Sequence, residues 1–205
     1  MSQSCPFESS QSAIAIFHIY DDHEIKNDYE GKSNDSSDPF PVASSAFKAY
    51  SADANYDSSR KGEFFYNFQY GDSAFFVLDT RRHRTRDSED PIEHTMLGDV
   101  QLAALYDWLG RVNSTSTFKF IVSSVPFTSL WDYFGTTDSW AGYPVEKAAL
   151  LQSLQSVPNV IIISGDRHEF AHIEFNTDTG NKIHEISTRY ITLARYVCFN
   201  TFTVL

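Results

Sequence analysis

Short apolar runs followed by polar segments recur along the chain, and two of these runs have the composition of buried strands. β-Branched and aromatic residues dominate 13–20 and 160–163. A polar segment follows each run directly, Asp21–Glu24 in the first case and Ser164–Glu169 in the second. Because α/β folds place their chemistry at the carboxyl ends of strands, both polar segments are candidates for a functional site.

The period of the apolar positions predicts further elements. Alternating aromatic residues at 64–70 and 73–78, joined by Gly71-Asp72, predict a β-hairpin. Apolar residues at helical spacing predict helices over 98–113 and 145–156. These helices are expected to contribute to the core and not to a site.

Irregular sequence separates the expected elements. Residues 27–57 are rich in Pro, Ser, Asn and Asp and are typical of a long surface loop, with a weak helical pattern at 41–50. This loop starts beside the first polar segment, so it either closes over a substrate or is a simple insertion. Residues 118–122 form another expected strand, and the aromatic, glycine-containing segment 131–143 is expected to form a lid or wall.

Strands that alternate with helices, together with an aromatic hairpin, predict an α/β fold in which two packed sheets are flanked by helices. One domain is expected over residues 13–188. Residues 1–12 are expected to be disordered, and residues 189–205 form an apolar tail without a helical or alternating period.

The composition is that of a globular protein with an acidic balance. Apolar residues make up 41% and aromatic residues 15% of the 205 positions, and the formal net charge is −11. This charge argues against a nucleic acid or an anionic membrane as the main partner. It fits cation binding, and a solubilising acidic surface would give the same excess. The oligomeric state is left open.

Cysteine usage and the length of the apolar runs bear on the compartment. Cys5 and Cys198 lie near opposite ends of the chain, which predicts two free thiols in a reducing compartment. No apolar run approaches the roughly 18 residues of a membrane span. The first residues lack the basic and apolar regions of a secretory signal. We therefore expect a cytoplasmic protein by default.

The two polar segments carry residue types that bind metal ions and transfer protons. Asp22 and His23 are adjacent, and Asp166 and His168 are two positions apart, so the latter pair faces the same way in an extended segment. Carboxylate oxygens and imidazole nitrogens suit metal cations, and histidine also transfers protons near neutral pH. Taken alone, the first segment is more typical of a surface turn, and Asp166 is typical of a turn cap.

A basic cluster follows the second hairpin strand of this acidic chain. Arg81, Arg82, Arg84 and Arg86 lie within six residues. Guanidinium groups bind phosphate through paired hydrogen bonds. They also pair with carboxylates, of which the chain has a surplus, and this structural interpretation is slightly favoured for any single arginine.

Four sequence blocks occur in order over residues 14–188: DDHEIKNDYEG, LDTRRHRT, SSVPF and SGDRHEF. Together they resemble the alkaline phosphatase D (PhoD-like) family of the metallophosphatase superfamily, and several blocks in order are far more specific than any one of them. The resemblance implies a four-layer α/β/β/α fold. It also implies a metal-dependent phosphoric ester hydrolase whose substrate is a phosphomonoester or a phosphodiester.

The resemblance assigns roles to individual residues. It implies Asp22, Asp166 and His168 as metal ligands, and His23 as the acid that protonates the leaving group. Asp21 and Glu24 would not bind the metal themselves but would hold the metal ligands in position. Arg81 would neutralise charge on the phosphoryl group, and Arg84 and Arg167 are secondary candidates for this role. Asn27 belongs to the first block without an assigned role.

The family suggests iron with calcium as the metal pair, with manganese or zinc as further candidates. Such cations would bind the phosphoryl oxygens and lower the pKa of a bound water, so that a metal-bound hydroxide attacks phosphorus in line.

Two features depart from the family pattern. In the superfamily, aspartates upstream of the DDHE-like block hold the first metal, whereas the first twenty residues here offer Glu8 and His18 as the usual ligand types. The tail at 189–205 also differs from the family's closing segment, so the chain resembles a truncated member. An inactive domain that binds a phosphorylated ligand, a single metal or a partner protein is therefore the alternative function.

A serine hydrolase is a weaker alternative, because no Gly-x-Ser-x-Gly elbow surrounds Ser164. The other histidines are expected to be ordinary surface or core residues: His18, His83, His94, His172 and His184.

Overall fold

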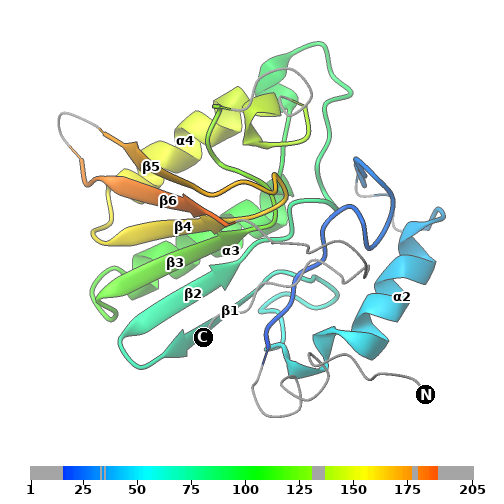
Figure 1. The fold of residues 1–205 in the computed structure, drawn as a ribbon, viewed down its shortest axis with the longest axis horizontal. Helices are drawn as coiled ribbons and strands as arrows, with labels where there is room; N and C mark the ends of the chain where they lie inside the picture. Colours follow the sequence, from blue (N-terminus) through cyan, green and yellow to red (C-terminus); the bar gives the residue numbers. More distant parts are fainter. Residues whose placement is uncertain (1–15, 33, 35, 131–136, 177–179, 189–205) are drawn as a thin grey trace.

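The computed structural model describes residues 16–32, 34, 36–130, 137–176 and 180–188 (Figure 1). Six strands form one sheet in the order β1-β2-β3-β4-β6-β5. The strands are β1 (Tyr66–Tyr70), β2 (Ser73–Val77), β3 (Phe118–Ser123), β4 (Val160–Ser164), β5 (Ala171–Phe175) and β6 (Ile183–Ser187). The helices are α2 (Phe40–Tyr50), α3 (Gly98–Val112) and α4 (Pro144–Gln155), with 3₁₀ turns η1 (Ala52–Ala54), η2 (Pro91–Glu93) and η4 (Trp140–Gly142).

The centre of the sheet is parallel and its two edges are antiparallel. Strands β2, β3, β4 and β6 run in the same direction, and β1 and β5 pair antiparallel with β2 and β6. Helix α3 connects β2 to β3, and α4 connects β3 to β4, as crossovers between parallel strands require. Both helices pack on one face of the sheet, and Figure 1 shows them behind the strands.

The core lies between these helices and the sheet. Every second residue of the strands faces the helices, and Phe76 and Ile121 are almost fully buried there. Trp108 of α3 meets Phe76 edge to face, with ring centroids 5.4 Å apart. Leu150 and Leu154 of α4 belong to the same cluster, and each buried leucine contributes roughly 1.5–3 kcal/mol through burial. The predicted helices over 98–113 and 145–156 are confirmed.

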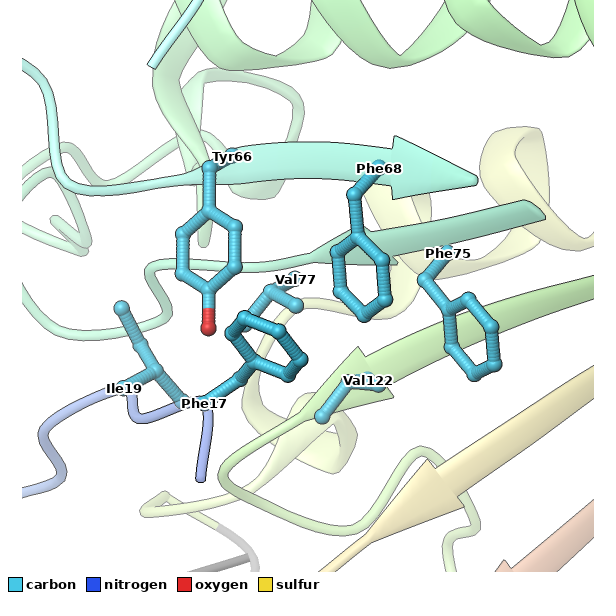
Figure 2. Close-up of a pocket in the computed structure, with 7 residues that line it drawn as sticks. All are labelled: Phe17, Ile19, Tyr66, Phe68, Phe75, Val77 and Val122. Carbon is cyan, nitrogen blue, oxygen red and sulfur yellow. The ribbon is translucent and has the colours of Figure 1, made fainter. Parts of the chain in front are cut away.

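The opposite face of the sheet is covered near β1, β2 and β3 by the segment at 16–20. Figure 2 shows Phe17 and Ile19 of this segment against Tyr66, Val77 and Val122 of the sheet. Aromatic stacking continues along this face from Phe68 to Phe75 and on to Phe120. The apolar character of residues 16–20 therefore reflects packing over a sheet and not membership of it.

The strand predicted over 13–20 is wrong for residues 16–20, and residues 13–15 lie outside the described part of the chain. Side chains bond the backbone here in place of a neighbouring strand. The His18 amide donates to Asn55 Oδ1 at 2.7 Å, and the His18 carbonyl accepts from Asn55 Nδ2 at 2.7 Å and from the Tyr66 hydroxyl at 3.0 Å. A single asparagine thus satisfies both backbone groups of His18.

The predicted α/β class is confirmed. The four-layer arrangement contains two sheets, whereas the strands of the described residues form one sheet. The hairpin at 64–78 and the helix at 41–50 are also confirmed, with Gly71 at a positive φ of 58° in the hairpin turn. The sequence pattern did not predict β5 and β6.

Several expectations concern residues outside the described ranges. The disordered segment 1–12, the tail 189–205 and residues 131–136 of the expected lid are among them. The described remainder of that lid is a buried wall, because Trp140 and Tyr143 are fully buried. No helix of the described chain is long and apolar enough to cross a membrane.

Candidate metal centre

The carboxyl ends of three parallel strands meet at the edge of the sheet where the polar sequence blocks converge. Arg81 lies just after β2, Ser124 directly follows β3, and Asp166 lies just after β4. The segment that begins at Asp21 reaches this edge from outside the sheet, and the Ser124 hydroxyl donates to Asp21 Oδ1 at 2.7 Å. The two polar segments predicted as one site are therefore brought together, as expected for the carboxyl ends of parallel strands.

Two groups of carboxylates at this edge could each hold a metal ion. Asp21, Asp22 and Asp166 form one group, and Asp22, Asp28 and Asp138 form the other. Within each group, one oxygen from every residue lies within 4.8 Å of the others. Asp22 belongs to both groups, so it is placed to bridge two cations.

Three buried oxygens in the first group accept no hydrogen bond from the described residues. They are Asp21 Oδ2, Asp22 Oδ1 and Asp166 Oδ2. Asp22 is 2% and Asp21 is 3% exposed, and an ionised oxygen without a donor is expensive to bury. A bound cation would remove this cost, so the residues present fit a metal ion with oxygen ligands.

Burial and mutual repulsion alter the ionisation of these carboxylates. Desolvation, followed by the charges of Asp21 and Asp138, raises the pKa of Asp166 to about 7. Desolvation also raises the pKa of Asp22, against the attraction of Arg81. Burial opposes the ionisation of Asp21 as well, but the charge and hydrogen bonds of Arg81 hold the pKa of Asp21 below its ordinary value.

Two fully buried arginines hold the carboxylates in place. Arg81 Nε donates to Asp21 Oδ1 at 2.6 Å, and Arg81 Nη2 donates to Asp138 Oδ2 at 3.3 Å. Arg84 Nη1 donates to Asp138 Oδ1 at 3.0 Å, and Arg84 Nε donates to the Thr80 carbonyl at 2.6 Å. Both side chains are 0% exposed. The basic cluster was expected to bind phosphate or to pair with carboxylates. In the structure, Arg81 and Arg84 pair with carboxylates.

A tight turn presents the residues around Asp22. The Asp22 carbonyl accepts from the amides of Ile25 at 2.8 Å and Lys26 at 2.6 Å. Within the same segment, Glu24 Oε2 accepts from the Asp21 amide at 2.8 Å. His23 is exposed on this turn. Glu24 therefore supports the backbone that carries the metal-binding candidates.

Asn27 and Asp28, which follow on the same turn, also hold the Asp22 carboxylate in place. The Asp28 amide donates to Asp22 Oδ2 at 2.7 Å, and Asn27 Nδ2 donates to Asp28 Oδ2 at 2.7 Å. Asn27 is exposed. It lies beside the carboxylate groups and contacts them through Asp28.

His168 and Arg167, the other two candidates on the loop after β4, lie outside the two carboxylate groups. His168 is exposed and belongs to neither carboxylate group. Arg167 Nη1 lies 3.9 Å from Asp166 Oδ2, and its side chain is 25% exposed. The Arg167 Nε is buried and bonds to no acceptor among the described residues. Arg84 Nη2 also lacks an acceptor among the described residues, but Arg84 is fully buried, whereas Arg167 is partly exposed.

Comparison with known families matches residues 3–196 to the family described as PhoD-like phosphatase. The chain belongs to this family. Alkaline phosphatase D of Bacillus subtilis (strain 168) is 28% identical to it over 211 residues, which cover 86% of this chain and 35% of that protein. The PhoD-like chain therefore spans little more than a third of the curated relative that it matches. The resemblance carried by the four sequence blocks is confirmed.

A solved structure of a dimetal phosphatase from Danio rerio has a similar fold. The TM-score is 0.52 at 16% sequence identity, and the match covers 89% of this chain and 63% of the zebrafish protein chain. At this identity the likeness concerns the fold, which is metallophosphatase-like.

Sequence reasoning missed Asp138, which contacts both buried arginines of the PhoD-like chain. It lies just before η4, in a segment interpreted as an aromatic wall. Two observations in the sequence could have pointed to it. Asp138 is an acidic residue between aromatic residues, and the arginines after β2 require carboxylate partners if they are buried.

Proposed function

We propose that this PhoD-like chain is a metal-dependent phosphoric ester hydrolase. The observation that carries the proposal is the set of three buried carboxylate oxygens without donors, contributed by Asp21, Asp22 and Asp166. Membership of a phosphatase family supports the reaction class. The substrate would be a phosphomonoester or a phosphodiester.

Asp22 and Asp166 would hold the first cation together with Asp21, and the resemblance adds His168 as a further ligand. Asp28 and Asp138 would share Asp22 with a second cation. A set composed mainly of carboxylate oxygens favours hard cations such as calcium, manganese or ferric iron. When bound, these cations would supply positive charge for the phosphoryl oxygens and acidify a water molecule.

His23 would donate the proton that the leaving oxygen takes up when the P–O bond breaks. Its position supports this role, because it is exposed and directly follows Asp22 on the turn. General acid catalysis of this kind contributes about 10²–10⁴ in rate, and most for leaving groups that are strong bases.

Arg167 would neutralise the phosphoryl charge in place of Arg81. Arg81 and Arg84 are fully buried, and each donates to the Asp138 carboxylate. Arg167 is partly exposed, lies beside Asp166 and has a buried Nε without an acceptor among the described residues. Arg81 is then a positioning residue that holds Asp21 and Asp138.

The experiment combines metal analysis with hydrolysis of matched esters. The purified chain is loaded with Mn²⁺ or with Fe³⁺ and Ca²⁺, its metal content is measured, and turnover of aryl and alkyl phosphomonoesters and phosphodiesters is followed. We expect His23→Ala to lose about 10²-fold or more in kcat on alkyl esters and much less on nitrophenyl esters, whose leaving group needs little protonation. Arg167→Met should lose about 10²-fold in kcat/KM on all of them.

Arg111→Met is the matched control, because Arg111 is an exposed arginine in the last turn of α3. It should leave turnover unchanged. If His23→Ala lost kcat equally on aryl and alkyl esters, His23 would not be the acid that protonates the leaving group. A chain that binds metal and inorganic phosphate without turnover would be a non-catalytic phospholigand-binding domain.

A further inference from the structure

Two histidines lie in contact on the edge of the sheet away from the buried aspartates. His172 Nε2 of β5 and His184 Nδ1 of β6 are 3.1 Å apart, and their rings stack with centroids 5.3 Å apart. His172 is exposed and His184 is half-buried. Neither histidine belongs to the carboxylate groups of the candidate metal centre.

The strand register places a carboxylate on the same face as these histidines. His184 lies directly opposite Glu174, and His172 lies two residues before Glu174 on β5. Because side chains alternate along a strand and opposite residues share a face, all three side chains emerge on one side of the sheet. The arrangement is two imidazoles and one carboxylate on two adjacent strands.

The separation of the two nitrogens suits one metal ion. Zinc–nitrogen bonds of about 2.0–2.1 Å place two imidazole nitrogens about 2.9 Å apart at a right angle and about 3.3 Å apart at the tetrahedral angle. The observed 3.1 Å lies between these values. Imidazole nitrogen suits zinc, copper and nickel, whereas hard cations prefer sites made of oxygen.

The carboxylate of Glu174 now accepts from Lys182 Nζ at 2.9 Å. Lys182 is 62% exposed, and a solvent-exposed ion pair of this kind contributes little stability. Glu174 can therefore exchange its lysine for a cation at small cost.

We propose that His172 and His184 form a surface binding site for a borderline divalent cation of the zinc and copper class. The Glu174 carboxylate does not lie within 4.8 Å of both imidazole nitrogens while it pairs with Lys182, and it would turn towards the cation as a third ligand. The site is separate from the carboxylate centre in both residues and ligand chemistry. Its nitrogen ligands suit zinc and copper, whereas the oxygen-rich centre suits hard cations.

The test is calorimetric titration of the full chain with Zn²⁺ in excess Ca²⁺, which occupies oxygen sites. We expect His172→Ala and His184→Ala each to weaken Zn²⁺ binding at least about tenfold. Glu174→Gln should weaken it as well, and Lys182→Met should strengthen it up to about fivefold because Glu174 loses its competing partner. His94→Ala, which changes a histidine outside this sheet, should leave the affinity unchanged.

Unchanged Zn²⁺ affinity in both histidine variants would overturn the proposal. Electron paramagnetic resonance of the unmodified chain with one equivalent of Cu²⁺, again in excess Ca²⁺, gives a second readout that needs no substitution. Nitrogen hyperfine structure from two imidazoles is expected, and a spectrum of oxygen ligands alone would refute the site. Neither result depends on whether the chain hydrolyses phosphate esters.

Discussion

Three aspartate or histidine residues at the candidate centre adopt left-handed backbone conformations. The φ angles are 71° for Asp166, 56° for His168 and 56° for Asp28. Such conformations cost on the order of 1 kcal/mol for residues with a side chain, although Asp and His tolerate them better than most. Surrounding contacts must hold them, and strain of this kind collects where side chains are aimed at a ligand.

Two segments of the site approach each other closely at Gly31. The Gly31 amide donates to the Arg81 carbonyl at 3.0 Å, and the Lys32 amide donates to the Arg84 carbonyl at 3.2 Å. A Cβ on Gly31 would lie 2.1 Å from the Arg82 carbonyl oxygen. We expect Gly31→Ala to lower the free energy of unfolding by about 2 kcal/mol or more, measured by urea denaturation, because backbone must move.

Gly110→Ala is the matched control for this prediction. Gly110 lies inside α3, and nothing lies within 4 Å of the position of an added Cβ. Alanine should stabilise the helix by about 0.5–1 kcal/mol. If Gly31→Ala were as harmless as Gly110→Ala, the close approach of the two segments would be wrong.

At the scale of elements, helix α3 fixes the point where β2 ends and the arginine segment begins. Gln101 Oε1 accepts from the Asp79 amide, and Gln101 Nε2 donates to the Asp79 carbonyl, both at 2.8 Å. The Asp79 carboxylate in turn accepts from the amides of Arg81 and Arg82 and from the Tyr20 hydroxyl. A helix whose apolar face fills the core thereby orients the polar end of the neighbouring strand.

Gln101→Met should therefore lower the free energy of unfolding more than a substitution of a surface glutamine does. Methionine fills a similar volume but leaves the buried amide and carbonyl of Asp79 without partners, at about 1–3 kcal/mol. Urea denaturation measures the loss, and metal affinity should fall with it because Arg81 and Asp21 are displaced. Gln152→Met, on the exposed side of α4, should change neither quantity.

At the scale of the whole molecule, the stability of the metal-free protein depends on pH because Asp166 is buried beside other carboxylates. The pKa of Asp166 rises from the ordinary 3.8 to about 7 on folding. Between these values the folded state binds more protons than the unfolded state, so the free energy of unfolding falls as pH rises from about 4 to about 7. Metal-free protein should thus be more stable at pH 5 than at pH 8.

Chemical denaturation in a chelator at both pH values tests this dependence. Asp166→Asn should be more stable than the unmodified chain by about 1–3 kcal/mol at pH 8, and the difference should shrink towards pH 4. Adding Mn²⁺ or Ca²⁺ at pH 8 should stabilise the unmodified chain and not Asp166→Asn. Asp57→Asn, at an exposed position, should show neither effect, and a flat pH profile of the unmodified chain would refute the prediction.

The sequence by itself determined the local elements and the family. Alternating aromatic residues specify the hairpin of β1 and β2, and helical spacing specifies α3 and α4, because each pattern depends on neighbours within a few residues. The polar blocks at 21–24 and 164–169 pointed to Asp22 and Asp166 because they follow apolar runs. The apolar run before Asp21 was taken for a strand, since its composition cannot distinguish pairing within a sheet from packing over one.

Only the tertiary structure decided which charges meet. Asp21 and Arg81 are 60 residues apart in the chain, and Asp138 and Arg84 are 54 apart. No local pattern encodes such pairs, which form because parallel strands bring their carboxyl ends to one edge of the sheet. The same long-range packing turned Arg81 from an expected phosphate ligand into a buried partner of carboxylates, and it brought His172 and His184 together on adjacent strands.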